Sequence, residues 1–222
     1  MLNPNGILFD LDGTLVDTSR DISANLNRAF EALGYPRLTH EKILSHVGYG
    51  AHFLVQQCLQ THRPDVKVDD QLVTEIWEKF RDFYHIHIID DAQPYPGVIE
   101  FLKREQRRPM GVISNKPQDM VRAVLKGLDL LQYFKFSWGR DTFPVSKPDP
   151  EIIRYGVHEL GFDDPGQVCM VGDNQVDTIA AKGAGAVSVA VTYGFTPSAR
   201  LEQEEPDYLL NSFPEFVEAL RS

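Results

Sequence analysis

Two aspartates directly follow a short apolar run near the beginning of the sequence. Asp10 and Asp12 come after Ile7–Phe9, and Gly13 then lets the backbone turn freely. Because alternate residues of an extended segment project to the same side, the two carboxylates share one side of the chain. Carboxylates placed in this way can hold a cation, although aspartates also serve simply as turn and capping residues.

A second acidic pair, Asp173 and Asp177, follows the apolar run Cys169–Val171. Carboxylates at the start of a helix often do no more than interact with the helix dipole. In a doubly wound parallel sheet, however, the carboxyl ends of the strands lie side by side, so this pair would meet Asp10 and Asp12 in one crevice. Four carboxylates repel one another unless a cation lies between them, and an all-oxygen set suits Mg²⁺. The sequence therefore predicts a magnesium site suited to phosphoryl chemistry.

Two further segments supply a hydroxyl and positive charge. Ser114-Asn115-Lys116 follows an apolar run that ends at Ile113, and Lys147 precedes a helical pattern. A hydroxyl and an ammonium at these points could hold phosphate oxygens. A lone serine or lysine is more often an ordinary surface residue, but Pro148 and Pro150 restrict where the Lys147 ammonium can go.

Short apolar runs alternate with helical patterns along most of the chain. Buried strands are expected at 7–9, 110–113, 169–171 and 187–191, with weaker candidates at 134–138 and 208–210. Apolar residues at helical spacing lie between them, and we expect each such set to be buried: Val98, Phe101 and Leu102; Val121, Val124, Leu125 and Leu128; Ile152, Ile153, Val157 and Leu160; Ile179, Ala180 and Ala184. This alternation predicts an α/β fold, a Rossmann-like parallel sheet flanked by helices.

Residues 18–91 interrupt that rhythm, because they carry several helical stripes and no convincing strand. The sequence predicts an inserted all-α domain there, between the two parts of an α/β core at 1–17 and 92–222, with hinges near Asp17 and Pro94. Gly34-Tyr35-Pro36 ends the first helix, and Thr39 is expected to cap the second. The stripes are Ile22, Leu26, Phe30 and Leu33; Phe53, Leu54 and Leu59; and Leu72, Ile76, Phe80 and Phe83.

The composition is that of an ordinary globular protein of 222 residues with a formal net charge of -10. That acidity argues against a nucleic-acid partner, and no apolar run approaches the length of a membrane span. Cys58 and Cys169 match no metal-ligand spacing and make no disulfide framework, which favours the cytoplasm. The sequence leaves open whether the protein is a monomer or a homodimer.

Four segments in this order resemble the haloacid dehalogenase superfamily. They are Asp10-x-Asp12-Gly13-Thr14, Ser114, Lys147-Pro148-Asp149-Pro150 and Gly172-Asp173-x-x-x-Asp177, and the resemblance covers the chain together with a helical cap inserted after the first segment. Five further stretches are similar to those of the phosphoglycolate phosphatases: Tyr95-Pro96-Gly97, Ser114-Asn115-Lys116-Pro117, Lys147-Pro148-Asp149-Pro150, Thr192-Tyr193-Gly194 and Pro206-Asp207-Tyr208.

The resemblance implies a role for each acidic residue. Asp10 would attack phosphorus and form an aspartyl-phosphate, while Asp12 would be the acid for the leaving alcohol and then the base for water. Mg²⁺ would be held by the Asp10 carboxylate, the Asp12 backbone carbonyl and Asp173, with Asp177 binding the ion or orienting its waters. True haloacid dehalogenases lack the second aspartate and the metal, so Asp12 and Asp173 argue against that chemistry.

The resemblance also implies which residues bind the phosphoryl group. Ser114 and Lys147 would hold it, and Lys147 would offset the negative charge around Asp10. Asn115 and the backbone amides of Gly13 and Thr14 would add donors.

The cap loop Val47–Ala51 is expected to face the substrate through Gly48 and Tyr49. The Tyr49 ring could narrow the pocket toward a small substrate or stack on a larger one. Four cap cations could read a substrate carboxylate or could be solvated surface charges: Arg20, Lys42, His46 and His52.

These observations favour a Mg²⁺-dependent phosphatase acting on a small phosphomonoester, with 2-phosphoglycolate as the first substrate to consider. The same residues would serve a sugar phosphomutase of the β-phosphoglucomutase kind, and inorganic pyrophosphate is a third candidate. A different class of function is a catalytically silent relative that binds a phosphate or a partner protein through its cap.

Overall fold

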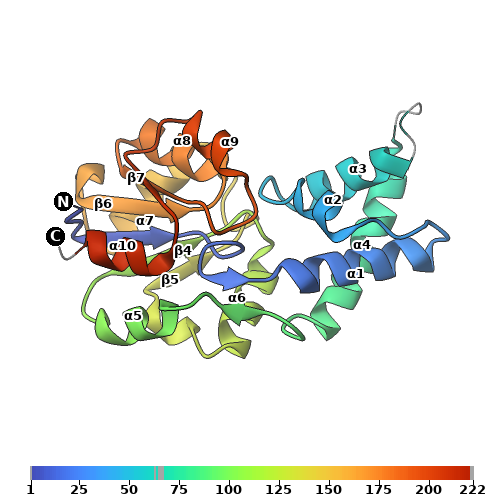
Figure 1. Ribbon diagram of the computed structural model, residues 1–222, viewed down its shortest axis with the longest axis horizontal. Helices are drawn as coiled ribbons and strands as arrows, with labels where there is room; N and C mark the ends of the chain where they lie inside the picture. The colour runs from blue at the N-terminus through green and yellow to red at the C-terminus, as the bar shows by residue number, and fades with distance from the viewer. Residues whose placement is uncertain (1, 63, 65–67, 221–222) are drawn as a thin grey trace.

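The computed structural model describes residues 2–62, 64 and 68–220 of the chain. Its centre is a six-stranded sheet in the order β5-β4-β1-β6-β7-β8, and all its neighbouring strands are parallel (Figure 1). The strands are β1 (Gly6–Phe9), β4 (Met110–Ile113), β5 (Phe136–Trp138), β6 (Val168–Gly172), β7 (Val187–Val191) and β8 (Tyr208–Leu210). The predicted α/β class is confirmed, and β1 lies at the centre with β4 and β6 as its neighbours.

Helices cover both faces of this sheet, because successive residues of each strand point to opposite sides. Phe9 in β1 packs against α5, α6 and α10, whereas its neighbour Leu8 packs against α7 and α8 on the other face. The helices of this unit are α5 (Val98–Arg104), α6 (Gln118–Gly127), α7 (Glu151–Leu160), α8 (Gln175–Ala184), α9 (Ser198–Glu202) and α10 (Phe213–Ala219), with short 3-10 turns at Leu131–Tyr133 and Pro165–Gln167. The sheet is therefore covered on both faces, and its three central strands, β1, β4 and β6, are apolar and fully buried.

Four helices between the short strands β2 (Val16–Asp17) and β3 (Gln93–Pro94) form a second unit beside the sheet (Figure 1). We call them the helical unit: α1 (Ser19–Ala32), α2 (His40–Leu44), α3 (Ala51–His62) and α4 (Asp70–Ile86). They enclose their own apolar core, and Thr39 caps α2 as expected by accepting a hydrogen bond from the Lys42 amide. Gly34, with a φ of +78°, follows the end of α1.

The two connections between the units run side by side. Val16–Asp17 (β2) and Gln93–Pro94 (β3) pair as a small antiparallel ribbon, with Val16 opposite Pro94 and Asp17 opposite Gln93. These are the residues near which the sequence places the hinges. The domain boundaries at 17/18 and 91/92 stay a prediction that is compatible with this arrangement.

One residue that the helical spacing predicts to be buried lies at the surface. Ile179 is 41% exposed, because the buried stripe of α8 runs through Val176, Ala180 and Ala184 instead. Phe53 is 37% exposed, while its neighbour Leu54 is buried in the helical unit. Within the described part of the chain, no helix is both long and apolar enough to span a membrane.

Phe9 is the centre of the larger core, and its removal should destabilise the whole protein. Its ring lies 5.9–6.4 Å, between centroids, from four other rings: Phe101 in α5, Phe213 and Phe216 in α10, and Phe134 in the segment before β5. We expect Phe9→Ala to lower the free energy of unfolding by about 3–5 kcal/mol, measured by urea denaturation. Ile86→Ala at an exposed position of α4 is the control and should change it by less than about 0.5 kcal/mol. Equal losses in the two variants would contradict this account of the core.

Candidate active site

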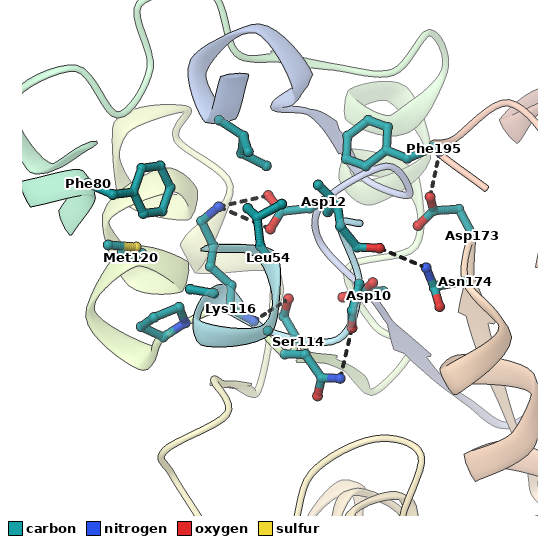
Figure 2. Close-up of a pocket in the computed structure, with 17 residues that line it drawn as sticks. Asp10, Asp12, Leu54, Phe80, Ser114, Lys116, Met120, Asp173, Asn174 and Phe195 are labelled. Carbon is teal, nitrogen blue, oxygen red and sulfur yellow. Dashed lines mark hydrogen bonds and ion pairs between the residues drawn. The ribbon is translucent and has the colours of Figure 1, made fainter. Parts of the chain in front are cut away.

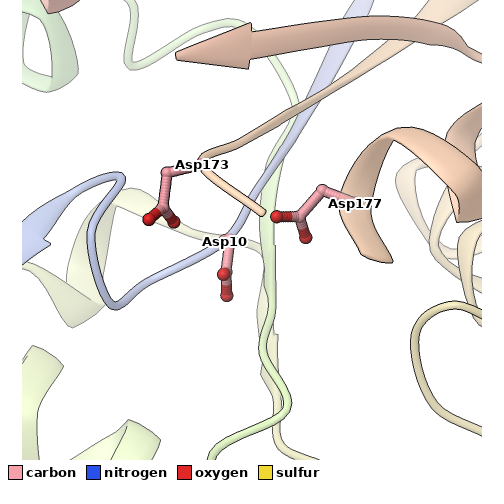
Figure 3. Close-up of side chains that lie close together, drawn as sticks. All are labelled: Asp10, Asp173 and Asp177. Carbon is pink, nitrogen blue, oxygen red and sulfur yellow. The ribbon is translucent and has the colours of Figure 1, made fainter. Parts of the chain in front are cut away.

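Three buried aspartates converge at the carboxyl ends of two neighbouring strands. Asp10 follows β1, Asp173 follows β6, and Asp177 lies in the first turn of α8. Their side chains point toward one another, and each offers an oxygen within 4.8 Å of the others (Figure 3). The parallel pairing of β1 with β6 produces this convergence, as the sequence predicted.

Local hydrogen bonds fix the orientation of each carboxylate. The Leu11 amide donates to Asp10 Oδ1 at 2.7 Å, and the Asn174 amide donates to Asp177 Oδ2 at 3.0 Å as part of a capping box at the start of α8. Asp173 accepts from the Phe195 amide at 2.7 Å and from the Thr14 hydroxyl at 3.2 Å. These hydrogen bonds hold the three carboxylates close together, although their negative charges repel one another.

The electrostatics of this group favour a bound cation. Burial raises the pKa of Asp173 well above its usual range, and the neighbouring charges of Asp10 and Asp177 add to the rise. Burial likewise raises the pKa of Asp177 to about 7, with Lys147 opposing the rise and Asp10 adding to it. Buried carboxylates that repel one another are the oxygen donors that a hard divalent ion neutralises. The residues present therefore fit a metal ion.

Lys147 lies on the other side of this group and is fully buried. Its Nζ is 3.0 Å from Asp10 Oδ1 and 2.6 Å from Asp177 Oδ1. Burial alone would lower the pKa of Lys147, but Asp10 and Asp177 outweigh that effect and raise it, so the ammonium stays charged. The predicted placement of this ammonium beside Asp10 agrees with the structure, and the Lys147-Pro148 peptide bond that follows it is cis.

The Asp12 carboxylate is not part of the metal-ligand cluster and has separate partners. Thr18 donates to Asp12 Oδ1 at 2.6 Å, and Lys116 Nζ lies 3.0 Å from Asp12 Oδ2. Lys116 also donates a 2.9 Å hydrogen bond to the hydroxyl of Tyr84 on α4. Neither Lys116 nor Tyr84 was assigned to the site from the sequence, although Lys116 belongs to the segment Ser114-Asn115-Lys116, which the sequence analysis considered as a source of positive charge. The two members of the first acidic pair thus face different surroundings.

The predicted phosphate-binding residues surround the same cluster, but several of their donors are engaged. Ser114 is buried after β4, and its Oγ accepts from the Lys116 amide at 3.3 Å. The side-chain amide of Asn115 donates to the backbone carbonyls of Gly48 and Lys147, at 2.9 Å each, so it joins the two units instead of presenting free donors. The Gly13 and Thr14 amides are bonded within their own turn, to Val16 and Leu11 carbonyls respectively.

A cavity of about 50 Å³ lies between the sheet unit and the helical unit (Figure 2). Its polar side carries Asp10, Asp12, Ser114, Asn115, Lys116, Asp173 and Asn174, and its apolar side carries Ile22, Val47, Ala51, Leu54, Phe80, Pro117, Met120 and Phe195 with Gly48 and Gly50. The sequence did not assign Asn174, Phe195 or the apolar wall to the site. The packing of α1, α3 and α4 against the sheet unit brings Ile22, Leu54 and Phe80 of that wall to the cavity.

The cap loop contributes to the cavity through its backbone and not through its tyrosine. Gly48 lines the cavity, and a Cβ there would lie 2.2 Å from Asn174 Nδ2, so only glycine fits this approach. Tyr49 is 42% exposed, packs on Phe53, and lines a neighbouring hollow of about 470 Å³. The positive φ values of Gly48 and Gly50 turn the loop so that Tyr49 points away.

The four cap cations considered from the sequence also lie outside the cavity lining, within the part of the chain that the structure describes. Arg20 is exposed and lies 4.0 Å from Asp91, and His52 packs on Trp77. Lys42 is exposed in the short helix α2. Burial lowers the pKa of His46, and Lys42 and Arg200 lower it further.

Comparison with known proteins agrees with this geometry. The family model of the haloacid dehalogenase-like hydrolases matches residues 7–191. The chain belongs to this family. The match includes both members of the first acidic pair, both lysines of the site and both members of the second acidic pair.

Individual relatives of this hydrolase also indicate a phosphatase. The phosphoglycolate phosphatase of Neisseria meningitidis is 36% identical over 97% of this chain and 93% of its own length, and that of Vibrio vulnificus is 32% identical over 96% and 95%. The crystal structure of a predicted phosphoglycolate phosphatase from Haemophilus somnus superposes with a TM-score of 0.91 at 27% identity over 99% of both chains. The predicted family, fold class and phosphatase activity are confirmed.

Mg²⁺ should stabilise the folded protein, because it relieves the repulsion among the three aspartates only when they are assembled. At a hundredfold excess over its dissociation constant, the ion should add about 2.7 kcal/mol and raise the melting temperature by roughly 5–10 °C. Asp173→Asn should melt at the same temperature with Mg²⁺ and with chelator. A wild-type melting temperature that does not respond to Mg²⁺ would argue against a metal site here.

Gly13 is needed because Asp173 occupies the space beside it. A Cβ at Gly13 would lie 2.3 Å from Asp173 Oδ2, so we expect Gly13→Ala to displace that carboxylate and to remove the stabilisation by Mg²⁺. Gly34→Ala is the matched control, since Gly34 has a similar φ of +78° against +82° but no atom within 4 Å of the added Cβ. The control should lose about 1 kcal/mol of stability and keep its response to Mg²⁺. The account fails if Gly13→Ala responds to the ion as strongly as Gly34→Ala does.

Proposed function

We propose that this protein is a Mg²⁺-dependent phosphatase that hydrolyses a small phosphomonoester, with 2-phosphoglycolate as its substrate. The observation that carries the proposal is the separation of two acidic groups within one cavity. Asp10 belongs to the buried aspartate cluster, whereas Asp12 stands apart beside Lys116. The proposed reaction needs a nucleophile and a separate acid, and the different surroundings of Asp10 and Asp12 suit these two roles.

In the proposed reaction, Asp10 attacks phosphorus, and the bond from phosphorus to the leaving oxygen breaks. Asp12 gives its proton to that oxygen, so glycolate leaves as an alcohol. Asp12 then takes a proton from water, whose oxygen attacks the phosphorus of the aspartyl-phosphate and releases Asp10 and inorganic phosphate. Both donors to Asp10, the Leu11 amide and Lys147, approach its Oδ1 and so orient the carboxylate for attack.

Mg²⁺ would be held by the Asp10 and Asp173 carboxylates and the Asp12 backbone carbonyl, with Asp177 binding the ion or its waters. When bound, it supplies positive charge that offsets the phosphoryl oxygens and the aspartates. Lys147 and Ser114 would bind the phosphoryl group, since both are buried next to Asp10. These donors stabilise charge on the equatorial oxygens while Asp10 attacks.

The choice of substrate is supported by the size of the cavity and by the relatives. About 50 Å³ bounded by Leu54, Phe80 and Met120 suits a leaving group of a few atoms better than a hexose or a nucleoside. The curated relatives at 32–36% identity are called phosphoglycolate phosphatases. Cys58 and Cys169 are free and buried, in keeping with the predicted cytoplasmic location, and the oligomeric state, monomer or homodimer, stays a prediction.

Release of phosphate from a panel of esters tests the proposal. The panel contains 2-phosphoglycolate, hexose phosphates, nucleotides and pyrophosphate, each with Mg²⁺ and with excess chelator. We expect Mg²⁺-dependent turnover with the highest kcat/KM for 2-phosphoglycolate. Asp10→Asn, which keeps the shape of the side chain and removes the nucleophile, should lower kcat by at least about 10³-fold. Asp90→Asn, at an exposed aspartate beside His87, is the control and should keep full activity.

Other outcomes would replace the proposal. Activator-dependent isomerisation of a hexose phosphate would indicate a phosphomutase, and release of two phosphates per molecule of pyrophosphate would indicate a pyrophosphatase. Turnover that survives Asp10→Asn would overturn the covalent mechanism. Absence of turnover on every ester would favour a binding function.

A further inference from the structure

The ammonium of Lys116 lies on the cavity wall beside Asp12, and the mechanism proposed above assigns it no role (Figure 2). Nζ lies 3.0 and 3.1 Å from the two carboxylate oxygens of Asp12 and donates to the Tyr84 hydroxyl at 2.9 Å. Burial alone would lower the pKa of Lys116, but Asp12 and Tyr84 outweigh that effect and raise it. Lys116 therefore brings a permanent positive charge to the cavity.

No other cation reaches this part of the cavity among the residues that the structure describes. The Lys147 ammonium is fully buried between Asp10 and Asp177, on the side of the nucleophile. Lys116 is the one positively charged residue in the described lining, and it stands on the side of the proposed acid, Asp12. The two lysines thus pair with different aspartates, Lys147 with the proposed nucleophile and Lys116 with the proposed acid.

The position of Lys116 relative to Asp12 determines which part of a substrate Lys116 can contact. In the proposed reaction the ester oxygen faces Asp12, so the rest of the leaving group extends from Asp12 into the cavity. Lys116 Nζ is itself within hydrogen-bond distance of Asp12. A carboxylate whose carbon is two bonds from the ester oxygen would therefore come within reach of Nζ.

Lys116 can accept such a partner without releasing Asp12. An ammonium has three N–H donors, and Lys116 directs them at two oxygens of the same carboxylate and at Tyr84. If one donor turns to a substrate carboxylate, Asp12 keeps the other donor and its 2.6 Å hydrogen bond from Thr18. The Tyr84 hydroxyl stays bonded, so no buried polar group is left without a partner.

The surroundings of Lys116 exclude most other leaving groups. Leu54, Phe80 and Met120 line the cavity next to it and offer no hydrogen bond to a neutral sugar or a base (Figure 2). The volume of about 50 Å³ favours a short acid over a long one. A short carboxylate fits both restrictions, because it pairs with the ammonium and needs little space.

We infer that Lys116 selects the leaving group by binding the carboxylate of a short phosphorylated 2-hydroxy acid. The inference rests on the proposed phosphatase function and narrows its substrate class to esters whose carboxylate lies next to the phosphorylated carbon. Tyr84, from α4 of the helical unit, holds the ammonium in place for this contact.

The test compares two esters of equal length in wild type and in Lys116→Met. One is 2-phosphoglycolate, and the other is 2-hydroxyethyl phosphate, which has a hydroxymethyl group in place of the carboxylate. We expect the wild type to prefer 2-phosphoglycolate and the substitution to lower the ratio of the two kcat/KM values by roughly 30-fold or more. Lys116→Arg should keep most of the ratio, since it keeps the charge. Lys79→Met, at an exposed lysine of α4, is the matched control and should leave the ratio unchanged.

The ratio separates the inference from the proposed function. If Lys116→Met slows both esters by the same factor, Lys116 acts only through Asp12, and the inference is wrong while the phosphatase proposal stands. If the wild type does not distinguish the two esters, the proposed substrate is wrong and the inference falls with it. Circular dichroism checks the fold of each variant. Lys116→Gln, which keeps hydrogen-bond donors for Asp12 and Tyr84, takes the place of Lys116→Met if the latter does not fold.

Discussion

The burial of three carboxylates within 4.8 Å of one another is the constraint on which the rest of this structure depends. Ionised carboxylates in such a group repel strongly in a medium of low dielectric constant, so the fold must compensate for them with positive charge and fixed donors. Parallel pairing of β1 with β6 brings Asp10 and Asp173 together, and the first turn of α8 adds Asp177. Lys147 and a set of backbone amides then hold the group in place.

With all four aspartates ionised, the charges around the cavity balance when a divalent cation is included. Asp10, Asp12, Asp173 and Asp177 carry four negative charges when ionised, and Lys116 and Lys147 carry two positive ones. A divalent ion would bring the sum to zero before an anionic substrate arrives. The two lysines neutralise different aspartates, since Lys147 pairs with the nucleophile and Lys116 with the acid. This division gives two neighbouring aspartates of one loop different chemical surroundings.

The sequence was sufficient to predict the residues whose positions depend on the sheet. Asp10, Ser114 and Asp173 follow strands, and parallel strands must bring their carboxyl ends to one edge. Residues whose position depends on how the helical unit packs could not be placed in the same way. Tyr84 reaches Lys116 only because α4 of the helical unit packs beside the segment that follows β4, and no local pattern specifies that packing. Tyr49 was expected to face the substrate, but the conformations of Gly48 and Gly50 turn it outward.

Two side chains of the sheet unit hold the cap loop of the helical unit through the loop's main-chain carbonyls. Asn115 donates to the carbonyl of Gly48, and Asn174 donates to the carbonyl of Val47 at 3.2 Å. Because every residue type has the same backbone carbonyl, the side chain at position 47 can change during evolution while the hydrogen bond from Asn174 is kept. Position 48 has no such freedom, since any side chain would collide with Asn174. The loop can therefore diverge between related enzymes, and reshape their pockets, while the two asparagines and one glycine preserve the way it closes.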